Sequence, residues 1–359
     1  MAPWYLKKSK TNLRSLSTRY QGGRVVWIIL LCAFLGASLV VGTTFVYVSQ
    51  TLETPLNPGE SVYVIKRGQS LKSFLKDLKG KGVIEEIYSP MVYAYWKGLT
   101  TRVKAGQYQF KNGLNQIQLL DKIVAGSVLE YQLRFIEGWT FRQVIKHLST
   151  SEHLKISLTG HSNKEIMSLL GKPNEHPEGR FFPDTYSFTL GESDIDILRR
   201  AYEAMQVILE QEWQKRSDEA RVATPYEALI LASIIEKETG LAEERTLISG
   251  VFTNRLNKKM RLQTDPTVIY GLGDSFNGNL KRKHLKADTE YNTYTRHGLP
   301  PTPIAMPGRE AINAALQPEA TKAIFFVSRG DGSHKFSETL EQHNDAVRKF
   351  QLRRKKKKS

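Results

Sequence analysis

The stretch LILASIIEKET, residues 229–239, is an apolar run that ends abruptly in two carboxylates, Glu236 and Glu238. A helix that is apolar on nearly every face is buried in a core. A carboxylate at the end of such a helix has low dielectric on one side, which raises its pKa and suits it to act as an acid at neutral pH. The stretch therefore predicts a core helix ending in an active-site acid. The alternative is that the carboxylates are only the first solvated turn after a core helix.

The two carboxylates are not expected to act as a pair on one substrate. Side chains two residues apart on a helix point about 200° apart, so Glu236 and Glu238 face opposite sides unless the helix ends between them. One of them is therefore the expected acid, and helix geometry alone does not decide which.

Several further segments make a pattern that is more specific than any one of them. In their order and spacing they resemble the signature segments of the YceG-like endolytic murein transglycosylases, and the likeness extends from about Val62 to Val347. The resemblance implies a bacterial envelope enzyme that cuts the glycan strands of peptidoglycan internally. The segments are EGRFFPDTY (178–186), EKET (236–239), RLQTDPTVIYG (261–271), YNTY (291–294) and GLPP (298–301).

The resemblance also implies the chemistry. It places the catalytic acid at Glu238, followed by Thr239, and leaves Glu236 with a structural role, bonded to a backbone amide or a basic partner. Such an enzyme uses one acid: Glu238 protonates the oxygen between MurNAc and GlcNAc, and the C6 hydroxyl of MurNAc attacks C1 to give a 1,6-anhydro end. No cofactor is expected.

The candidate substrate-binding residues lie in the later segments. Gln263, Thr264 and Asp265 carry hydrogen-bonding groups suited to sugar hydroxyls and acetamides. The alternative is that Asp265 lies at or near the N-cap of the helix that follows. Asn292 and Tyr294 are further candidates, with a turn or core role as the alternative, and Tyr270 is a weaker aromatic candidate. Phe181 and Phe182 are expected to pack in the core rather than to stack on sugar.

The charge distribution argues against a nucleic-acid binder. The formal net charge is +16, but six basic residues precede residue 25 and six more lie at 353–358. A folded basic face, which duplex binding requires, is not indicated. Nor does any motif predict a metal or phosphate site, since the eight His residues are scattered and no Gly-rich phosphate loop occurs.

Residues 25–48 contain no charged side chain and are long enough to cross a bilayer of about 30 Å. We expect an uncleaved transmembrane helix, because the apolar region of a signal peptide is shorter, about 7 to 15 residues. The basic residues before it predict a cytoplasmic N-terminus and a single-pass protein of the cytoplasmic (inner) membrane with its catalytic domain outside the cytoplasm. The only cysteine, Cys32, lies in this span, so no disulfide is expected outside it.

The predicted fold class is α+β: one N-terminal transmembrane helix, a small LysM-like βααβ module and a mixed α+β catalytic domain. The module either grips glycan or serves as a spacer. Expected partners are peptidoglycan strands and the membrane, and proteins of cell-wall synthesis are further candidate partners. The predicted parts are a basic cytoplasmic segment (1–24), the transmembrane helix (25–48), a linker (49–61), the LysM-like module (62–128), the YceG-like catalytic domain (129–347) and a basic tail (348–359) that is disordered from residue 353.

Two other functions fit the sequence. One is a hydrolytic muramidase with Asp265 or Asp288 as a second carboxylate. The other is a non-catalytic scaffold of the envelope that binds glycan or division proteins, against which the presence of Glu238, Gln263 and Asp265 argues.

Overall fold

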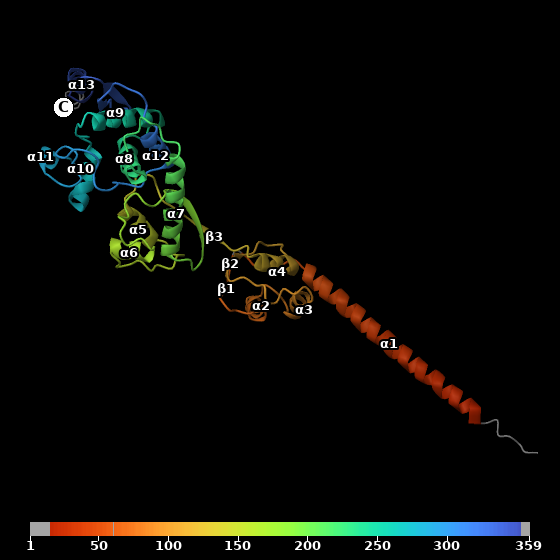
Figure 1. The fold of residues 1–359 in the computed structure, drawn as a ribbon. Helices are drawn as coiled ribbons and strands as arrows, with labels where there is room; N and C mark the ends of the chain where they lie inside the picture. The colour runs from red at the N-terminus through yellow and green to blue at the C-terminus, as the bar shows by residue number, and fades with distance from the viewer. Residues whose placement is uncertain (1–14, 60, 353–359) are drawn as a thin grey trace, which may run out of the picture. The chain divides into compact units, whose positions relative to one another are not determined.

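The computed structural model describes residues 15–59 and 61–352 (Figure 1). The chain divides into two compact units, with the boundary after Leu129. The described part is mixed α+β, with helices predominating and three small two-stranded antiparallel sheets, which confirms the predicted fold class.

The first unit begins with the long helix α1 (Ser15–Glu53). Its segment Arg24–Glu53 is long and apolar enough to cross a membrane, and none of its most apolar part is buried against protein. The helix continues to Glu53, so the first five residues of the predicted linker 49–61 are helical. No Pro or Gly lies between Gly42 and Pro55, and the residue before a proline disfavours helix, so α1 ends only there.

The rest of the first unit has the predicted strand, helix, helix, strand order. Strand β1 (Val62–Ile65) pairs antiparallel with β2 (Gly106–Gln109). Apolar residues at helical spacing in α2 (Leu71–Gly80) pack beneath this sheet. The hydroxyl of Ser70 caps the start of α2 by accepting from the Ser73 amide at 3.2 Å. The unit is completed by α3 (Tyr88–Trp96) and α4 (Gln116–Ala125).

The second unit has two hydrophobic clusters. One lies around the sheet formed by β3 (Glu130–Arg134) and β4 (Thr185–Thr189), where Phe181 is fully buried. Phe182 packs against the other cluster, so both aromatics pack as predicted. The helices of this unit are α5 (Phe141–Ser149), α6 (Asn163–Leu169), α7 (Asp194–Trp213), α8 (Pro225–Glu238), α9 (Arg245–Asn257), α10 (Asp265–Leu272), α11 (Arg282–Lys286), α12 (Arg309–Leu316) and α13 (Leu340–Val347), with short helices η1 (Ala242–Glu244), η2 (Gly273–Ser275) and η3 (Arg348–Leu352).

Helix α8 is the centre of the second cluster. The hydroxyl of Thr224 accepts from the Glu227 amide at 3.1 Å, and Pro225 at the first turn has no amide hydrogen to satisfy. Residues 228–235 are all buried because α7, α9, α10 and α12 pack around α8. This confirms the predicted core helix and fixes its C-terminal end.

The C-terminal part of the unit is a hairpin followed by helix. Strand β5 (Phe325–Ser328) pairs antiparallel with β6 (His334–Ser337), and α13 packs on both strands. Residues 348–352, at the start of the predicted basic tail 348–359, continue α13 as η3. The predicted disorder from residue 353 lies outside the described residues.

Candidate active site

The two carboxylates at the end of α8 lie on opposite sides of the helix, as their spacing predicts. Oε2 of Glu236 accepts the backbone amide hydrogen of Gly308 at 3.1 Å. Oε1 of Glu238 accepts the hydroxyl hydrogen of Thr264. Glu236 therefore holds the start of α12 in place, and the predicted bond to a backbone amide is confirmed. Glu238 is the carboxylate on the side of the 261–271 segment.

Burial raises the pKa of Glu238 to about 7. The Thr264 hydroxyl opposes this shift by bonding the carboxylate, while the negative charge of Asp265 adds to it. His334 and Arg255 lower the pKa by a smaller amount. A carboxyl group with a pKa near 7 is about half protonated at neutral pH, so it can both donate and accept a proton there.

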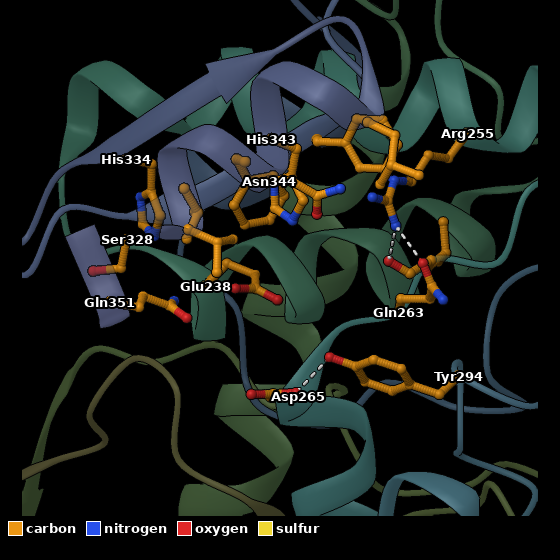
Figure 2. Close-up of a pocket in the computed structure, with 16 residues that line it drawn as sticks. Glu238, Arg255, Gln263, Asp265, Tyr294, Ser328, His334, His343, Asn344 and Gln351 are labelled. Atoms are coloured by element: carbon orange, nitrogen blue, oxygen red, sulfur yellow. Dashed lines mark hydrogen bonds between the residues drawn. The ribbon is translucent and has the colours of Figure 1, made fainter. Parts of the chain in front are cut away.

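Glu238 lies in a cleft of about 560 Å³, to which α8, α9, the segment 262–265, the β5–β6 hairpin and α13 contribute (Figure 2). Gln263, Asp265 and Tyr294 line this cleft with Glu238. The Tyr294 hydroxyl donates to Oδ1 of Asp265 at 2.6 Å. Gln263 has a left-handed backbone, with φ of 50°, between the buried Leu262 and Thr264. The left-handed region is uncommon for a residue other than glycine and marks a locally constrained backbone.

Thr264 is buried beside the cleft and contacts the acid. Its hydroxyl donates to Glu238, while its backbone amide donates to the Thr293 hydroxyl at 3.1 Å. Thr264 is also the N-cap residue of α10, with Asp265 in the first turn and Pro266 behind it. The segment 264–265 therefore both begins α10 and lies at the cleft, so the two roles considered for it occur together in the structure.

Asn292 and Tyr270 do not line this cleft. The Asn292 side-chain amide donates to the carbonyls of His284, Leu285 and Ala287, the shortest bond being 2.6 Å to Ala287, and its Oδ1 accepts from the Tyr294 amide at 2.9 Å. Asn292 thus holds the turn that carries Tyr294. A direct contact of Asn292 with substrate stays a prediction.

Tyr270 points its hydroxyl elsewhere. It donates to Oε2 of Glu178 at 2.9 Å, and its ring packs edge-on against Tyr291 with centroids 4.8 Å apart. Burial raises the pKa of Glu178 to about 7, but Glu178 is only 4 % exposed and also accepts from the Phe141 amide. This pair joins α10 to the loop that carries Glu178, and sugar binding by Tyr270 likewise stays a prediction.

The two carboxylates considered as partners of Glu238 differ in position. Asp265 lines the cleft. Asp288 is exposed, pairs with the Arg296 guanidinium at 2.9 Å and is not among the cleft residues. Of the two, only Asp265 is placed to act beside Glu238.

A family model described as the YceG-like family matches residues 63–349. This chain belongs to the YceG-like family. Among its relatives is an endolytic murein transglycosylase of Bacillus subtilis strain 168, 29 % identical over 332 residues, which are 87 % of this chain and 91 % of the relative. A relative of the same name from Streptococcus pneumoniae strain D39 is 25 % identical over 90 % of this chain and 64 % of its own length. The crystal structure of a YceG-like protein from Listeria monocytogenes is 30 % identical and covers 79 % of this chain and 98 % of its own, with a TM-score of 0.49.

Sequence reasoning missed the far wall of this YceG-like cleft, which comes from α9 and residues 325–351. Arg255 donates to the carbonyls of Ile324 at 2.6 Å and Leu262 at 2.8 Å, so its guanidinium ties the hairpin to the segment before Gln263. The missed cleft residues with polar side chains are Arg255, Ser328, His334, His343, Asn344 and Gln351.

His334 is held by a carboxylate 90 residues earlier in the chain. Glu244 accepts both the backbone amide hydrogen of His334, at 2.8 Å, and its ring Nδ1, at 2.7 Å. Within the described residues Nε2 makes no hydrogen bond. A carboxylate that binds Nδ1 fixes the ring orientation and leaves Nε2 available to a ligand. The one feature of the sequence that could have indicated a role for His334 is its position at the start of a strand, directly after the turn at 329–333.

The arrangement suits acid catalysis on a polar polymer. It combines one carboxyl group that titrates near neutral pH with hydrogen-bonding side chains from several elements around an open cleft. Among residues 15–59 and 61–352 no group of three His, Cys, Asp or Glu side chains is placed to hold a metal ion.

Proposed function

We propose that this chain is an endolytic murein transglycosylase that cleaves the β-1,4 bond between MurNAc and GlcNAc within glycan strands, with Glu238 as its acid. The observation that carries the proposal is the position of Glu238 at the end of a buried helix, facing the cleft with a pKa of about 7. Relatives that carry this activity in their names and align over most of the chain support it.

In the proposed mechanism protonated Glu238 donates its proton to the glycosidic oxygen as the bond from that oxygen to C1 of MurNAc breaks. The resulting carboxylate then accepts the proton of the C6 hydroxyl as O6 forms its bond to C1. The products are a free GlcNAc hydroxyl and a 1,6-anhydroMurNAc end, and no water is consumed. The intramolecular attack is favoured because O6 is already held near C1.

The neighbouring residues have distinct roles in this proposal. Thr264 orients the carboxyl group through its hydrogen bond. Gln263, Asp265 and Tyr294 offer hydrogen bonds to the sugar, and Asp265 adds negative charge where positive charge develops at C1. Asn292 acts through Tyr294, whose backbone it holds.

Helix α1 is proposed to anchor the enzyme in the cytoplasmic membrane, with its N-terminus in the cytoplasm and everything after about residue 50 outside. The support is the long apolar segment and the basic residues before it. For the parts of the chain we propose the boundaries expected from the sequence, with the anchor helix extended to Glu53. Glycan strands are the proposed substrate and partner.

A hydrolytic muramidase is the second candidate, because Asp265 lines the same cleft as Glu238. In that reaction a second carboxylate activates water or acts as nucleophile. The two reactions differ in the new MurNAc end, which is anhydro in one and reducing in the other.

The proposal is tested by comparing Glu238→Gln with Glu236→Gln on purified peptidoglycan. Glutamine keeps the shape of the side chain but cannot donate an acidic proton, so Glu238→Gln should lower the cleavage rate by about 10² to 10⁴. Glu236→Gln is the matched control: it lies two residues away on the same helix and keeps an oxygen that can accept from Gly308. Near-normal cleavage by Glu238→Gln together with loss in Glu236→Gln would assign the acid to Glu236.

A further inference from the structure

Helix α3 in the first unit presents an aromatic face to solvent. Tyr88, Val92, Tyr95 and Trp96 lie within about 100° of one another around the helix axis. They are 75 %, 57 %, 81 % and 75 % exposed. Pro90 and Ala94, on the opposite face, are buried in the module. A contiguous exposed face of large apolar side chains on a soluble surface marks an interaction site.

This face carries aromatic rings but none of the charged or amide side chains that would direct hydrogen bonds to a sugar. Helix α3 has the sequence YSPMVYAYW, with no Asp, Glu, Asn, Gln, Lys or Arg. Sites that bind polar ligands combine an apolar surface with directed polar groups beside it. Exposed Tyr and Trp are typical of the membrane interface, where one end of the ring is in apolar surroundings and the other is hydrated.

The position of α3 along the chain favours a membrane. Helix α1 packs against α3 and α4 at its C-terminal end, where Leu52 is buried and Val48 is partly buried. A hydrocarbon core of about 30 Å takes up about 20 residues after Arg24. Val48 then lies about 6 Å beyond the core at 1.5 Å per residue, within the headgroup region, which adds roughly 5 to 8 Å on each side. The module therefore meets α1 at headgroup depth.

The charge of the module complements an anionic membrane surface. Residues 54–129 contain eleven Lys and Arg against five Asp and Glu. Lys97 directly follows α3, and its Nζ lies 4.5 Å from the centre of the Trp96 ring. Basic residues beside a membrane span are attracted to anionic lipids.

We propose that α3 lies on the outer surface of the cytoplasmic membrane, with Tyr88, Val92, Tyr95 and Trp96 in the interfacial layer of anionic phospholipid. The proposal rests on the proposed anchoring of α1. The first unit then has two attachments to the bilayer, the transmembrane span of α1 and the exposed face of α3. Two attachments fix the orientation of the module against the membrane, whereas α1 alone would let the module rotate about the helix axis.

The test uses the full chain with Cys32 replaced by Ser and a nitroxide attached to a single new cysteine, Tyr95→Cys. The protein is reconstituted in vesicles of phosphatidylcholine and phosphatidylglycerol, and collisions of the label with oxygen and with a water-soluble nickel complex are measured. Lys76→Cys, exposed on α2, is the matched control. Both labelled variants should unfold at the same temperature as their Cys32→Ser parent in detergent, which shows that the fold is intact.

The label at 95 should be shielded from nickel and accessible to oxygen, while the label at 76 remains accessible to nickel. Adding Lys97→Gln should lower the ratio of docked to undocked protein about fivefold, as expected for one basic residue at an anionic surface. Equal nickel accessibility at 95 and 76 would overturn the proposal. So would protection at 95 only after glycan strands are added, or spin coupling between two copies.

The native Cys32 separates failure of the docking from failure of the anchor. Cys32 is exposed on α1 within the span. Labelled in the unsubstituted chain, it should show the low nickel accessibility of the hydrocarbon core. A shielded Cys32 with a water-accessible residue 95 leaves the anchor in place and refutes the docking, whereas a water-accessible Cys32 refutes both.

Discussion

Two substitutions beside Glu238 should move its pKa in opposite directions. Thr264→Val removes the hydroxyl that bonds the carboxylate and keeps nearly the same shape, so the charged form loses support and the pKa rises above about 7. Asp265→Asn removes a negative charge that disfavours the carboxylate, so the pKa falls. Both substitutions lie in the same segment of the cleft wall, so opposite shifts of the Glu238 pKa would reflect the change in charge and hydrogen bonding and not a general disturbance of that segment.

The size of the first shift follows from the contact. A hydrogen bond to a charged group contributes about 1.5 to 3 kcal/mol, and one pKa unit corresponds to about 1.4 kcal/mol. Since Glu238 is partly open to the cleft, we expect an upward shift of about one unit from the lower end of that range. Asp265 has a smaller influence than the Thr264 hydroxyl, so its removal should lower the pKa by less.

The assay is kcat/KM for cleavage of glycan strands as a function of pH. The protonated acid is the active form, so the rate constant of the unsubstituted protein should fall about tenfold per pH unit above about 7. This falling limb should move to higher pH in Thr264→Val and to lower pH in Asp265→Asn, whatever either change does to the maximum. Limbs that stay in place or move in the same direction would refute this assignment of the proton donor.

Three further predictions concern stability and topology. Glu238→Gln should stabilise the fold more at pH 8 than at pH 5 in thermal unfolding. The reason is that the raised pKa of Glu238 in the folded state makes its carboxyl group stabilising at low pH and destabilising as the pH rises through about 7. An equal effect at both pH values would contradict the burial argument. Gly250→Ala should destabilise the second unit by roughly 1 to 3 kcal/mol, because the new methyl group meets the Glu319 carbonyl, and chemical denaturation would show it as a lower midpoint. A reporter fused after Ser359 should be active only outside the cytoplasm, and activity inside would overturn the proposed orientation of α1.

The sequence was sufficient for the parts of the fold and site that depend on local pattern. The run that begins at Leu229 predicts a buried helix because nearly every face is apolar, and the two-residue spacing places Glu236 and Glu238 on opposite sides. The polar residues of 263–265 are close to Glu238 in the structure because α10 begins directly beside the end of α8.

The remainder of the site depends on contacts that no local pattern encodes. Arg255 faces the cleft from α9, and His334 is oriented by Glu244 across 90 residues, so nothing in the neighbouring sequence marks either side chain. Asn292 illustrates the converse: a polar residue in a signature segment has its amide committed to three backbone carbonyls. Residue type suggested binding, which stays a prediction, and the structure adds a role in holding the turn at 1 % exposure.

The central claim is that Glu238 alone drives an intramolecular transfer, and digestion of peptidoglycan in ¹⁸O-labelled water tests it most directly. Mass spectrometry of the new MurNAc ends should find 1,6-anhydro sugars without label, because O6 of the same residue is held near C1 and competes as if at very high concentration. Asp265→Asn should leave that product unchanged while altering the rate. Reducing MurNAc ends carrying one ¹⁸O per cleavage would contradict the account and identify a muramidase that uses Asp265 as its second carboxylate.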